Sequence, residues 1–366
     1  MIRGNSKDRI LIISTLGLVA FGAVMVYSTS YVVAMRKFGD GFYFVEKQII
    51  FALIGFLAFL AASRIPYEFY KKLTYPLLIL STVFLVMLMI PGMGHSAGGA
   101  KRWLKLPGFT FQPSEFAKFA VVVFMAYSLE AKKNVIKDFS LGFLPNILIP
   151  GVIIALIMRE PDFGTAVTLG FLVFIMNFIA GVRLRYLGGL ALAALPVFYV
   201  VVTNFSYMMK RLLIFLDPWA DPDGAGFQIV QSFIAFGSGG IWGVGLGDGL
   251  QKLLYLPEAH TDFIFSIIGE EFGLVGVTVM VALYIAYLIC GVKIASSAKD
   301  LFGKYLALGL TFMVSLQALI NMAVVLGILP PKGLPLPFIS YGGTSLIVSM
   351  FSSGVLLNIC IKGNEG

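Results

Sequence analysis

The amino-acid sequence predicts an all-α, polytopic membrane protein of about ten transmembrane helices. Of its 366 residues, 58% are hydrophobic and only 13% are charged, and the mean hydropathy is +0.92. Soluble domains carry about 25% charged residues, so this composition excludes that class. The apolar residues also form runs of about 20, the length needed to cross a bilayer. We therefore expect one membrane domain over residues 10–361, between short tails at 1–9 and 362–366.

Ten apolar runs are long enough to span a membrane. In chain order they lie near residues 10–31, 45–64, 74–91, 113–130, 142–158, 164–182, 184–203, 262–291, 303–327 and 337–361. The first run follows the bases Arg3, Lys7 and Arg9, as a signal peptide would, but it exceeds 20 residues and has no A-x-A cleavage site. We interpret it as a retained anchor.

The charge distribution predicts that both chain ends face the cytoplasm. With that orientation, the inner segments hold 15 of the 27 lysines and arginines but only 6 of the 19 acidic residues. Inner loops of membrane proteins carry such an excess of bases. The same dispersal over short loops argues against a nucleic-acid partner, which would require a basic arm or stripe. Cys290 and Cys360 then lie at inner helix ends, where we expect neither a disulfide nor a metal site.

The outer face is predicted to carry the functional loops. Residues 92–112 and 204–261 are long, rich in Gly and Pro and too polar to span, and loops of that length are usually functional or disordered. Within the larger loop, between the seventh and eighth spans, Phe227–Ile241 is apolar enough to lie along the membrane surface or to fold back onto the bundle.

Glu115 and Lys118 open the fourth span, directly after Pro113, a residue suited to a first helical turn. Their i, i+3 spacing places both charges on one helix face, and a charge inside a span needs a partner or a function. We expect an ion pair facing the bundle interior. Such a pair either takes part in substrate binding or only fixes helix packing.

Asp262 begins the eighth span, after an outer loop that also supplies Glu258 and His260. A carboxylate in a first helical turn is favoured by the helix dipole, so helix capping is one interpretation. An extracytoplasmic general base is the other. Metal ligation is disfavoured, because the chain has only two histidines, His95 and His260, and no second ligand at helical spacing.

Glu270 and Glu271 follow in the same span, roughly 12 Å deeper than Asp262 if the helix is straight. Helical geometry places Glu271 on nearly the opposite face from Asp262, so we do not expect either glutamate to share a substrate with it. We expect both to be protonated or paired, in a structural role.

Two basic pairs lie in the outer loops, Lys101 with Arg102 and Lys210 with Arg211. Arginine offers a planar fork and lysine a point charge to a pyrophosphate, although each pair alone is also explained by contact with lipid headgroups. Asp162 lies in a third polar outer turn, where it is placed to cap the sixth span.

Several segments, in this order, resemble the SEDS family of peptidoglycan polymerases (FtsW, RodA and SpoVE) over nearly the whole chain. They are Lys101-Arg102-Trp103, Gln112-Pro113-Ser114-Glu115 with Lys118, Pro161-Asp162-Phe163-Gly164-Thr165, Arg211 with Asp217-Pro218, Gly226-Phe227-Gln228 with Gln231-Ser232, His260-Thr261-Asp262-Phe263-Ile264-Phe265, and Leu336-Pro337-Phe338-Ile339-Ser340-Tyr341-Gly342-Gly343. Thr344 stands where the family often has Ser, which keeps the hydroxyl. Met25-Val26-Tyr27-Ser28 and Gly327-Ile328-Leu329-Pro330-Pro331-Lys332-Gly333 favour the division (FtsW) branch.

The resemblance implies a glycosyltransferase that polymerises lipid II at the outer face of the bacterial cytoplasmic (inner) membrane, at the division septum for the FtsW branch. It implies a class B penicillin-binding transpeptidase and other division proteins as partners. Asp262 aligns with the family's essential aspartate and is the candidate catalytic residue. The candidate substrate-binding residues are Glu115, Lys118, Arg102, Lys101, Arg211, Asp162, His260 and Ser340.

Three other readings stay open from the sequence. A lipid II flippase would also have ten helices with intramembrane charges, although it predicts polar residues along a path through both leaflets. An elongation-type (RodA) polymerase and a scaffold that recruits the transpeptidase without chemistry are the others. No dedicated metal site is encoded; a divalent cation, Mg or Mn, is the one cofactor that would suit a pyrophosphate substrate.

Overall fold

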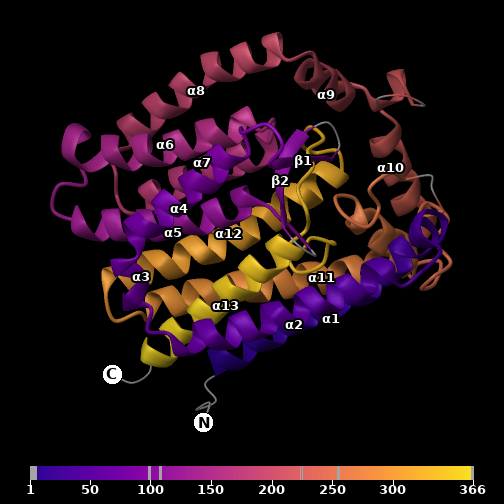
Figure 1. Cartoon of the computed structure of the whole chain (residues 1–366), viewed down its shortest axis with the longest axis horizontal. Helices are drawn as coiled ribbons and strands as arrows, with labels where there is room; N and C mark the ends of the chain where they lie inside the picture. The colour runs from indigo at the N-terminus through magenta and orange to yellow at the C-terminus, as the bar shows by residue number, and fades with distance from the viewer. Residues whose placement is uncertain are drawn as a thin grey trace.

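The computed structural model describes residues 6–97, 100–106, 109–222, 224, 226–253 and 256–363, and it is a bundle of long helices (Figure 1). Asp8 at the start of the first helix lies beside Cys360 near the end of the last. The two helices therefore begin and end on the same side of the bundle. That this side is the cytoplasmic one stays a prediction.

A helix occupies each of the ten predicted spans. In order they are α1 (Ser6–Phe38), α2 (Tyr43–Arg64), α4 (Thr74–Met87), α5 (Pro113–Ala131), α6 (Leu144–Arg159, preceded by a π-helical turn, Phe139–Phe143), α7 (Phe163–Ile179), α8 (Leu184–Asn204), α11 (Ile264–Ser296), α12 (Leu301–Val325) and α13 (Gly343–Gly363). A short helix, α3 (Glu68–Lys72), links α2 to α4. Within the described residues, seven helices are long and apolar enough to cross a membrane. The all-α polytopic fold is confirmed, and the number ten stays a prediction.

Two predicted boundaries differ from the structure. The first helix begins at Ser6, so the described part of the expected tail 1–9 is helical. The last helix begins at Gly343 rather than at 337. Residues 336–341 form a turn instead, because Ser340 Oγ accepts a hydrogen bond from the Leu336 amide at 2.8 Å. Phe338 in this turn has a positive φ of 68°, which is incompatible with a continuing α-helix.

The loop between α4 and α5 contains a small antiparallel sheet that was not predicted; we call this loop and the one between α8 and α11 outer, following the predicted topology. Its strands are β1 (Gly94–Ala97), β2 (Ala100–Leu106) and β3 (Phe109–Phe111), in the order β1-β2-β3. Successive side chains of a strand point to opposite faces. The register of β1 against β2 shifts between His95 and Ser96, which pair with Trp103 and Lys101, so this alternation is interrupted at Arg102.

The large outer loop is also partly helical, with α9 (Ser206–Leu216), a 3-10 turn (Pro218–Ala220) and α10 (Phe227–Gly239). Of the two arrangements expected for α10, the structure has the one folded back onto the bundle. Ser232 Oγ lies 2.7 Å from Ser266 Oγ and donates to the Val325 carbonyl at 2.7 Å.

A break at Gly273 divides α11 into a short outer part and a 23-residue part that is long enough to span. Gly273 has φ 61° and ψ −160°, outside the helical region. The loop after α10 fits into this break, since the Val244 amide donates to the Glu270 carbonyl and the Leu274 amide to the Gly240 carbonyl, each at 3.0 Å.

Glu270 and Glu271 lie between Ile264 and this break, so the break does not alter their separation from Asp262. Glu270 accepts hydrogen bonds from the backbone amides of Leu250 and Gln251 in the large loop. Glu271 forms a buried ion pair with Lys252 at 2.5 Å and accepts a hydrogen bond from Ser28 of α1. Both glutamates are paired, as predicted, and their depth in the membrane stays a prediction.

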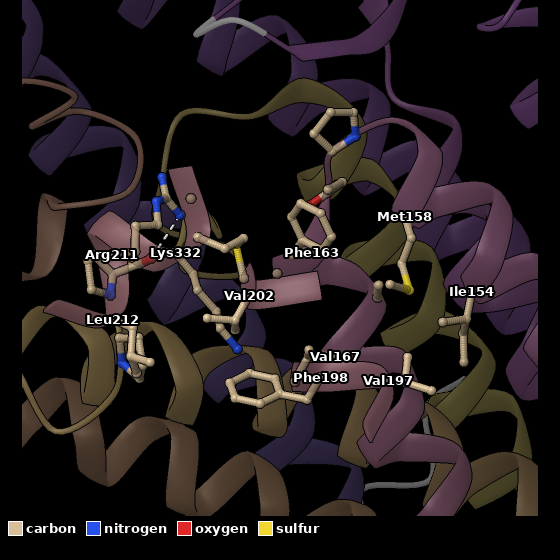
Figure 2. Close-up of a pocket in the computed structure, with 18 of the residues that line it drawn as sticks. Ile154, Met158, Phe163, Val167, Val197, Phe198, Val202, Arg211, Leu212 and Lys332 are labelled. Atoms are coloured by element: carbon tan, nitrogen blue, oxygen red, sulfur yellow. Dashed lines mark hydrogen bonds between the residues drawn. The ribbon is translucent and has the colours of Figure 1, made fainter. Parts of the chain in front are cut away.

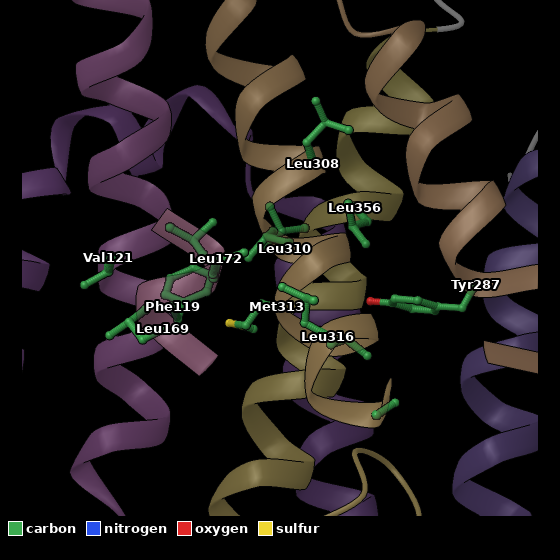
Figure 3. Packing of buried hydrophobic residues seen from close by; sticks show 14 of the residues in the cluster. Phe119, Val121, Leu169, Leu172, Tyr287, Leu308, Leu310, Met313, Leu316 and Leu356 are labelled. Carbon is green, nitrogen blue, oxygen red and sulfur yellow. The ribbon is translucent and has the colours of Figure 1, made fainter. Parts of the chain in front are cut away.

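The core of the bundle lies where α5, α7 and α12 meet (Figure 3). Phe119, Leu169, Leu172, Leu310 and Met313 are buried there. Helices in lipid associate through close packing and hydrogen bonds rather than through hydrophobic burial. The small and medium apolar side chains of this core permit such packing, and they give the outer ends of α5 and α12 a fixed spacing.

Candidate active site

The segment that carries Asp262 is held by three backbone carbonyls in succession. The carbonyls of residues 260–262 accept hydrogen bonds from the Tyr341 amide (2.9 Å), from Ser340 Oγ (2.5 Å) and from Asn321 Nδ2 (2.8 Å), respectively. The first two donors come from the turn before α13 and the third from α12. This clamp fixes the peptide of Asp262 while leaving its carboxylate free of the backbone.

Asp262 does not cap the helix that follows it. The helix begins at Ile264, its N-cap residue is Phe263, and no side-chain hydrogen bond caps it. The capping interpretation of Asp262 therefore lacks its defining hydrogen bond.

The Asp262 carboxylate faces Arg102 across Gly333. A β-carbon placed on Gly333 would lie 2.9 Å from Asp262 Oδ2 and 3.8 Å from Arg102 Nη1. Burial, together with the nearby charge of Glu258, raises the pKa of Asp262 to about 7, although Arg102 and Arg211 act in the opposite direction. A carboxyl group with this pKa changes its charge near neutral pH, as a general base should.

A cavity of about 430 Å³ lies between α6, α7, α8, α9 and the turn that follows α12. Asp262 is not among its lining residues, but Gly333, which the Asp262 carboxylate approaches, is one of them. Figure 2 shows Arg211 and Lys332 toward one end and the apolar side chains of Met158 and Ile154 toward the other. Arg102 also lines it. The cavity therefore combines a cationic end with an apolar wall.

The cationic end is held by backbone carbonyls. Arg102 Nη2 donates to the Pro161 carbonyl at 2.6 Å, and Arg211 Nη1 donates to the Pro331 carbonyl at 2.8 Å. Burial and the neighbouring Arg102 lower the pKa of Arg211 to about 10, which leaves it protonated at neutral pH. Burial and Arg211 also lower the pKa of Lys332. Three cations thus gather at one end of the cavity.

Asp162 lines the cavity but has a structural task there. Its carboxylate caps α7, accepting hydrogen bonds from the Thr165 amide at 3.2 Å and from Thr165 Oγ1 at 2.9 Å. Ser114 and Gln112 donate to it at 3.4 and 3.5 Å. The predicted cap is confirmed, and it joins α7 to the start of α5.

Glu160 is a second acid close to this end. It is buried, and within the described part of the chain neither of its carboxylate oxygens has a hydrogen-bond partner. Burial, together with the charge of Asp162, raises the pKa of Glu160 to about 9. Glu160 is therefore neutral at pH 7 and adds no negative charge beside Arg102.

Glu115 and Lys118 lie apart from the cavity lining. They form a buried ion pair with a Lys118 Nζ to Glu115 Oε1 distance of 2.8 Å, and each side chain is only 2% exposed. The same ammonium donates to Gln317 Oε1 of α12. The sequence predicted the pair, and the structure places it between helices.

Three other predicted residues also lie outside the cavity lining. The His260 ring packs against Phe44 and Tyr341, with ring centroids 4.7 and 6.0 Å apart. Lys101 is exposed, and it does not line the cavity as its neighbour Arg102 does. The Ser340 hydroxyl is occupied within the protein, because it bonds to the backbone on both sides. Of the predicted substrate contacts, Arg102, Arg211 and Asp162 are brought together in the cavity wall.

Sequence reasoning missed Lys332, Gln317 and Asn321. Lys332 is the lysine of Pro331-Lys332-Gly333, directly after an apolar span, and an isolated base at such a place was a usable signal. Gln317 and Asn321 are amides inside a span, and their i, i+4 spacing placed them on one face. An uncharged amide costs less to bury than a charge, so these two did not stand out.

Known proteins resemble this chain along nearly its whole length. Residues 8–365 match the family described as cell cycle protein, FtsW/RodA/SpoVE. A probable peptidoglycan glycosyltransferase FtsW of Geobacter sulfurreducens is 49% identical over 355 residues, which cover 97% of this chain and 95% of the relative. The stage V sporulation protein E of Bacillus subtilis is 41% identical, with 97% of each chain covered.

A solved structure is also similar. It was described under the words "structural coordination of polymerization and crosslinking by a peptidoglycan synthase complex". The TM-score is 0.81 at 29% sequence identity, and the match covers 97% of this chain and 98% of the other. The likeness therefore includes the outer loops as well as the helices.

Proposed function

The chain belongs to the FtsW/RodA/SpoVE family of cell cycle proteins, and from this premise we propose how its outer cavity performs peptidoglycan glycosyl transfer. Relatives named FtsW are up to 49% identical over nearly the full chain. The protein is a peptidoglycan glycosyltransferase of the cell-division branch, and it polymerises lipid II into glycan strands. We therefore favour this function over an elongation-type (RodA) polymerase and over a scaffold without catalytic activity.

Asp262 is the general base of the proposed reaction. It takes the proton of the acceptor sugar's 4-hydroxyl as that oxygen bonds to the anomeric carbon of the donor. The bond between this carbon and the diphosphate oxygen breaks, and undecaprenyl diphosphate leaves. One displacement inverts an α-linked donor to a β-linked product, so one base is sufficient. The observation that carries the proposal is the Asp262 carboxylate, which faces Arg102 across Gly333 at the edge of the cavity.

The three cations stabilise the leaving group. Negative charge develops on the diphosphate as the sugar departs, and fixed charges in a site of low polarity stabilise it more strongly than water does. Arg102 and Arg211 offer planar forks to phosphate oxygens, and Lys332 offers a point charge. The apolar wall from α6, α7 and α8 suits the first isoprene units of the lipid. Substrate contact by Lys101, His260 and Ser340 stays a prediction.

The cavity offers few side-chain ligands for a divalent cation. Within the described residues, no three His, Cys, Asp or Glu side chains lie together as metal ligands would. Asp162, the acid in the wall, is engaged in capping α7. An Mg or Mn ion that accompanies the substrate would therefore be held mainly by diphosphate oxygens, and we derive no step through it.

The flippase reading predicts polar residues along a path through both leaflets. Glu270 and Glu271 are the charges that did not cluster with the others in the sequence. Glu270 bonds to the backbone of the large loop, and Glu271 bonds to Lys252 of that loop and to Ser28 of α1. Both thus have structural partners, which favours the glycosyltransferase over the flippase.

We also propose the finer setting of the reaction. The protein spans the membrane several times; both termini in the cytoplasm and a place at the division septum are part of the proposal. A solved relative is a complex that coordinates polymerisation and crosslinking. This supports a class B penicillin-binding transpeptidase as the partner, with other division proteins around it.

The test is a polymerisation assay with the full chain in lipid vesicles, with and without the transpeptidase, supplied with labelled lipid II. Glycan strands that require Asp262 support the proposal. Transfer of lipid II between leaflets without strand formation would instead support the flippase.

A further inference from the structure

Two amide side chains of α12 bind the backbone on both sides of the site. Gln317 Nε2 donates to the Pro335 carbonyl at 2.8 Å. Asn321, one helical turn further on, donates through Nδ2 to the Leu334 carbonyl at 2.7 Å and to the Asp262 carbonyl at 2.8 Å. Both side chains are almost fully buried. One face of α12 thus joins the Asp262 segment to the turn that carries Lys332 and Gly333.

The ion pair on α5 determines how the first of these amides is oriented. Lys118 has only donors, so the atom of Gln317 that it contacts must be the carbonyl oxygen. The amide nitrogen then points to the Pro335 carbonyl. Lys118 is itself held by Glu115 at 2.8 Å. Rotation of the Gln317 amide by 180° would place its NH2 group against the Lys118 ammonium and its oxygen against the Pro335 carbonyl.

The orientation of Asn321 is equally constrained. Its two backbone partners are both carbonyls, which only the amide nitrogen can satisfy, since it carries two hydrogens. A buried donor or acceptor left without a partner costs about 1 to 3 kcal/mol. Any other orientation of the Gln317 or Asn321 amide would therefore leave buried hydrogen-bonding groups without partners and lower the stability of the arrangement.

We propose that Gln317 and Asn321 are positioning residues, which transmit the arrangement set by the Glu115–Lys118 pair to the peptide of Asp262. The pair then acts on the reaction through α12, without touching the substrate. The inference rests on the proposed function, because it takes Asp262 as the base. It assigns the Glu115–Lys118 pair a role different from the substrate contact expected from the sequence.

Substitutions that remove single links test the relay, defined as Glu115, Lys118, Gln317 and Asn321. Gln317→Met and Asn321→Leu keep the volume but lose the amide, and Gln317→Glu keeps the acceptor for Lys118 while losing the donor to Pro335. The control is Ser315→Ala on the same helix, because the Ser315 hydroxyl has no partner within the described residues. The full chain is assayed in vesicles with the transpeptidase and lipid II.

We expect kcat to fall on the order of 10²-fold in the relay variants, since a misplacement of about 1 Å at a reacting group costs that much. The KM for lipid II should stay nearly constant. The acid limb of the pH profile should move to lower pH, because an Asp262 carboxylate that is held less firmly would be better hydrated, and hydration lowers its pKa. Ser315→Ala should match the wild type. A higher KM with unchanged kcat, or relay variants that lose only thermal stability, would overturn the proposal.

The doubly neutral variant Glu115→Gln/Lys118→Met tests the first link without leaving an unpaired buried charge. We expect the same loss of kcat and the same pH shift as in Gln317→Met. The two changes should not add when combined, because they break one path. Additive losses, or a raised KM, would indicate direct substrate contact and contradict the relay.

Hydrogen exchange without substrate separates the relay from the proposed function. Amides of residues 258–263 and 332–336 should exchange faster in Asn321→Leu than in the wild type or in Ser315→Ala. If these amides respond while the wild type makes no glycan, the relay stands and the proposed function fails. If the exchange is unchanged, the relay is wrong, whatever the activity.

Discussion

Two walls of the cavity, the turn 330–333 backed by α12 and the helix α8, are built differently. In its most apolar stretch α12 is 67% buried, whereas α8 is only 12% buried. α12 is joined to the base segment and the following turn by amide hydrogen bonds. The described side-chain hydrogen bonds of α8 stay within α8, as those of Thr203 and Asn204 do, and Figure 1 shows α8 at the edge of the bundle. Helices in lipid associate through packing and hydrogen bonds. The wall next to Asp262 is therefore held firmly, and the α8 wall is held weakly.

This difference suggests a division of labour. Changes at the fixed wall should lower the rate of the chemical step. Changes at the α8–α9 wall should raise KM, with a further loss of kcat only where a cation that binds the diphosphate is removed. The predictions below use this contrast, from the largest expected effect to the smallest.

Asp262→Asn removes the base from the fixed wall. General-base catalysis contributes typically 10²–10⁴-fold, so we expect kcat for polymerisation to fall by about that factor with little change in KM. Measurement of strand formation and of Tm checks this. Asp248→Asn, at an exposed outer-loop carboxylate, is the control. Substantial polymerisation by Asp262→Asn would remove Asp262 from the role of base.

Gly333→Ala adds a methyl group 2.9 Å from Asp262 Oδ2, so the carboxylate has to shift. We expect kcat to fall on the order of 10²-fold. Gly342→Ala is the matched control, because its added methyl would meet nothing nearer than 3.8 Å. Equal activity of the two variants would show that the base is not closely held.

Arg211→Ala removes a cation from the α8–α9 wall. A hydrogen bond to a charged group contributes about 1.5 to 3 kcal/mol, so kcat/KM should fall roughly tenfold or more. Because Arg211 binds the diphosphate both before and during its departure, KM should rise and kcat should also fall. Arg211→Lys should recover part of the binding, since it keeps the charge but not the fork. Lys210→Ala, at the exposed neighbour, is the control. A loss confined to kcat would contradict the division between the walls.

Glu258→Gln should produce the smallest effect. The Glu258 charge raises the pKa of Asp262, so its removal should move the acid limb of the rate profile to lower pH. Glu258 is exposed and screened by solvent, so the shift should be well under one pH unit at physiological salt. A shift to higher pH would show that the cause assigned to the raised pKa is wrong.

The sequence predicted much of the fold and less of the site. Runs of about 20 apolar residues revealed the helices, because the bilayer sets their length. Gly273 was invisible as a break, since a glycine within an apolar helix usually only weakens it. The late start of α13 depends on the turn at Ser340, a tertiary feature that hydropathy does not report.

Residue types indicated Asp262, Arg102 and Arg211 as candidates, but not which of them meet. Arg102 and Lys101 are neighbours in sequence, yet Arg102 lines the cavity and Lys101 does not, a difference that depends on the strand β2, which was not predicted. The role of the Gln317 and Asn321 amides can be recognised only from the backbone carbonyls to which they donate. Contacts between segments far apart in the chain therefore had to come from the structure.

The pH dependence of glycan-strand formation tests the central claim most directly. Only the ionised carboxylate accepts a proton, so kcat/KM should rise with pH through a midpoint near the pKa of about 7 that burial gives Asp262. This profile should appear for the full chain with its transpeptidase, and the limb should vanish from the residual activity of Asp262→Asn. A wild-type rate that is flat between about pH 5 and pH 9, or an Asp262→Asn variant that keeps the limb, would contradict the account.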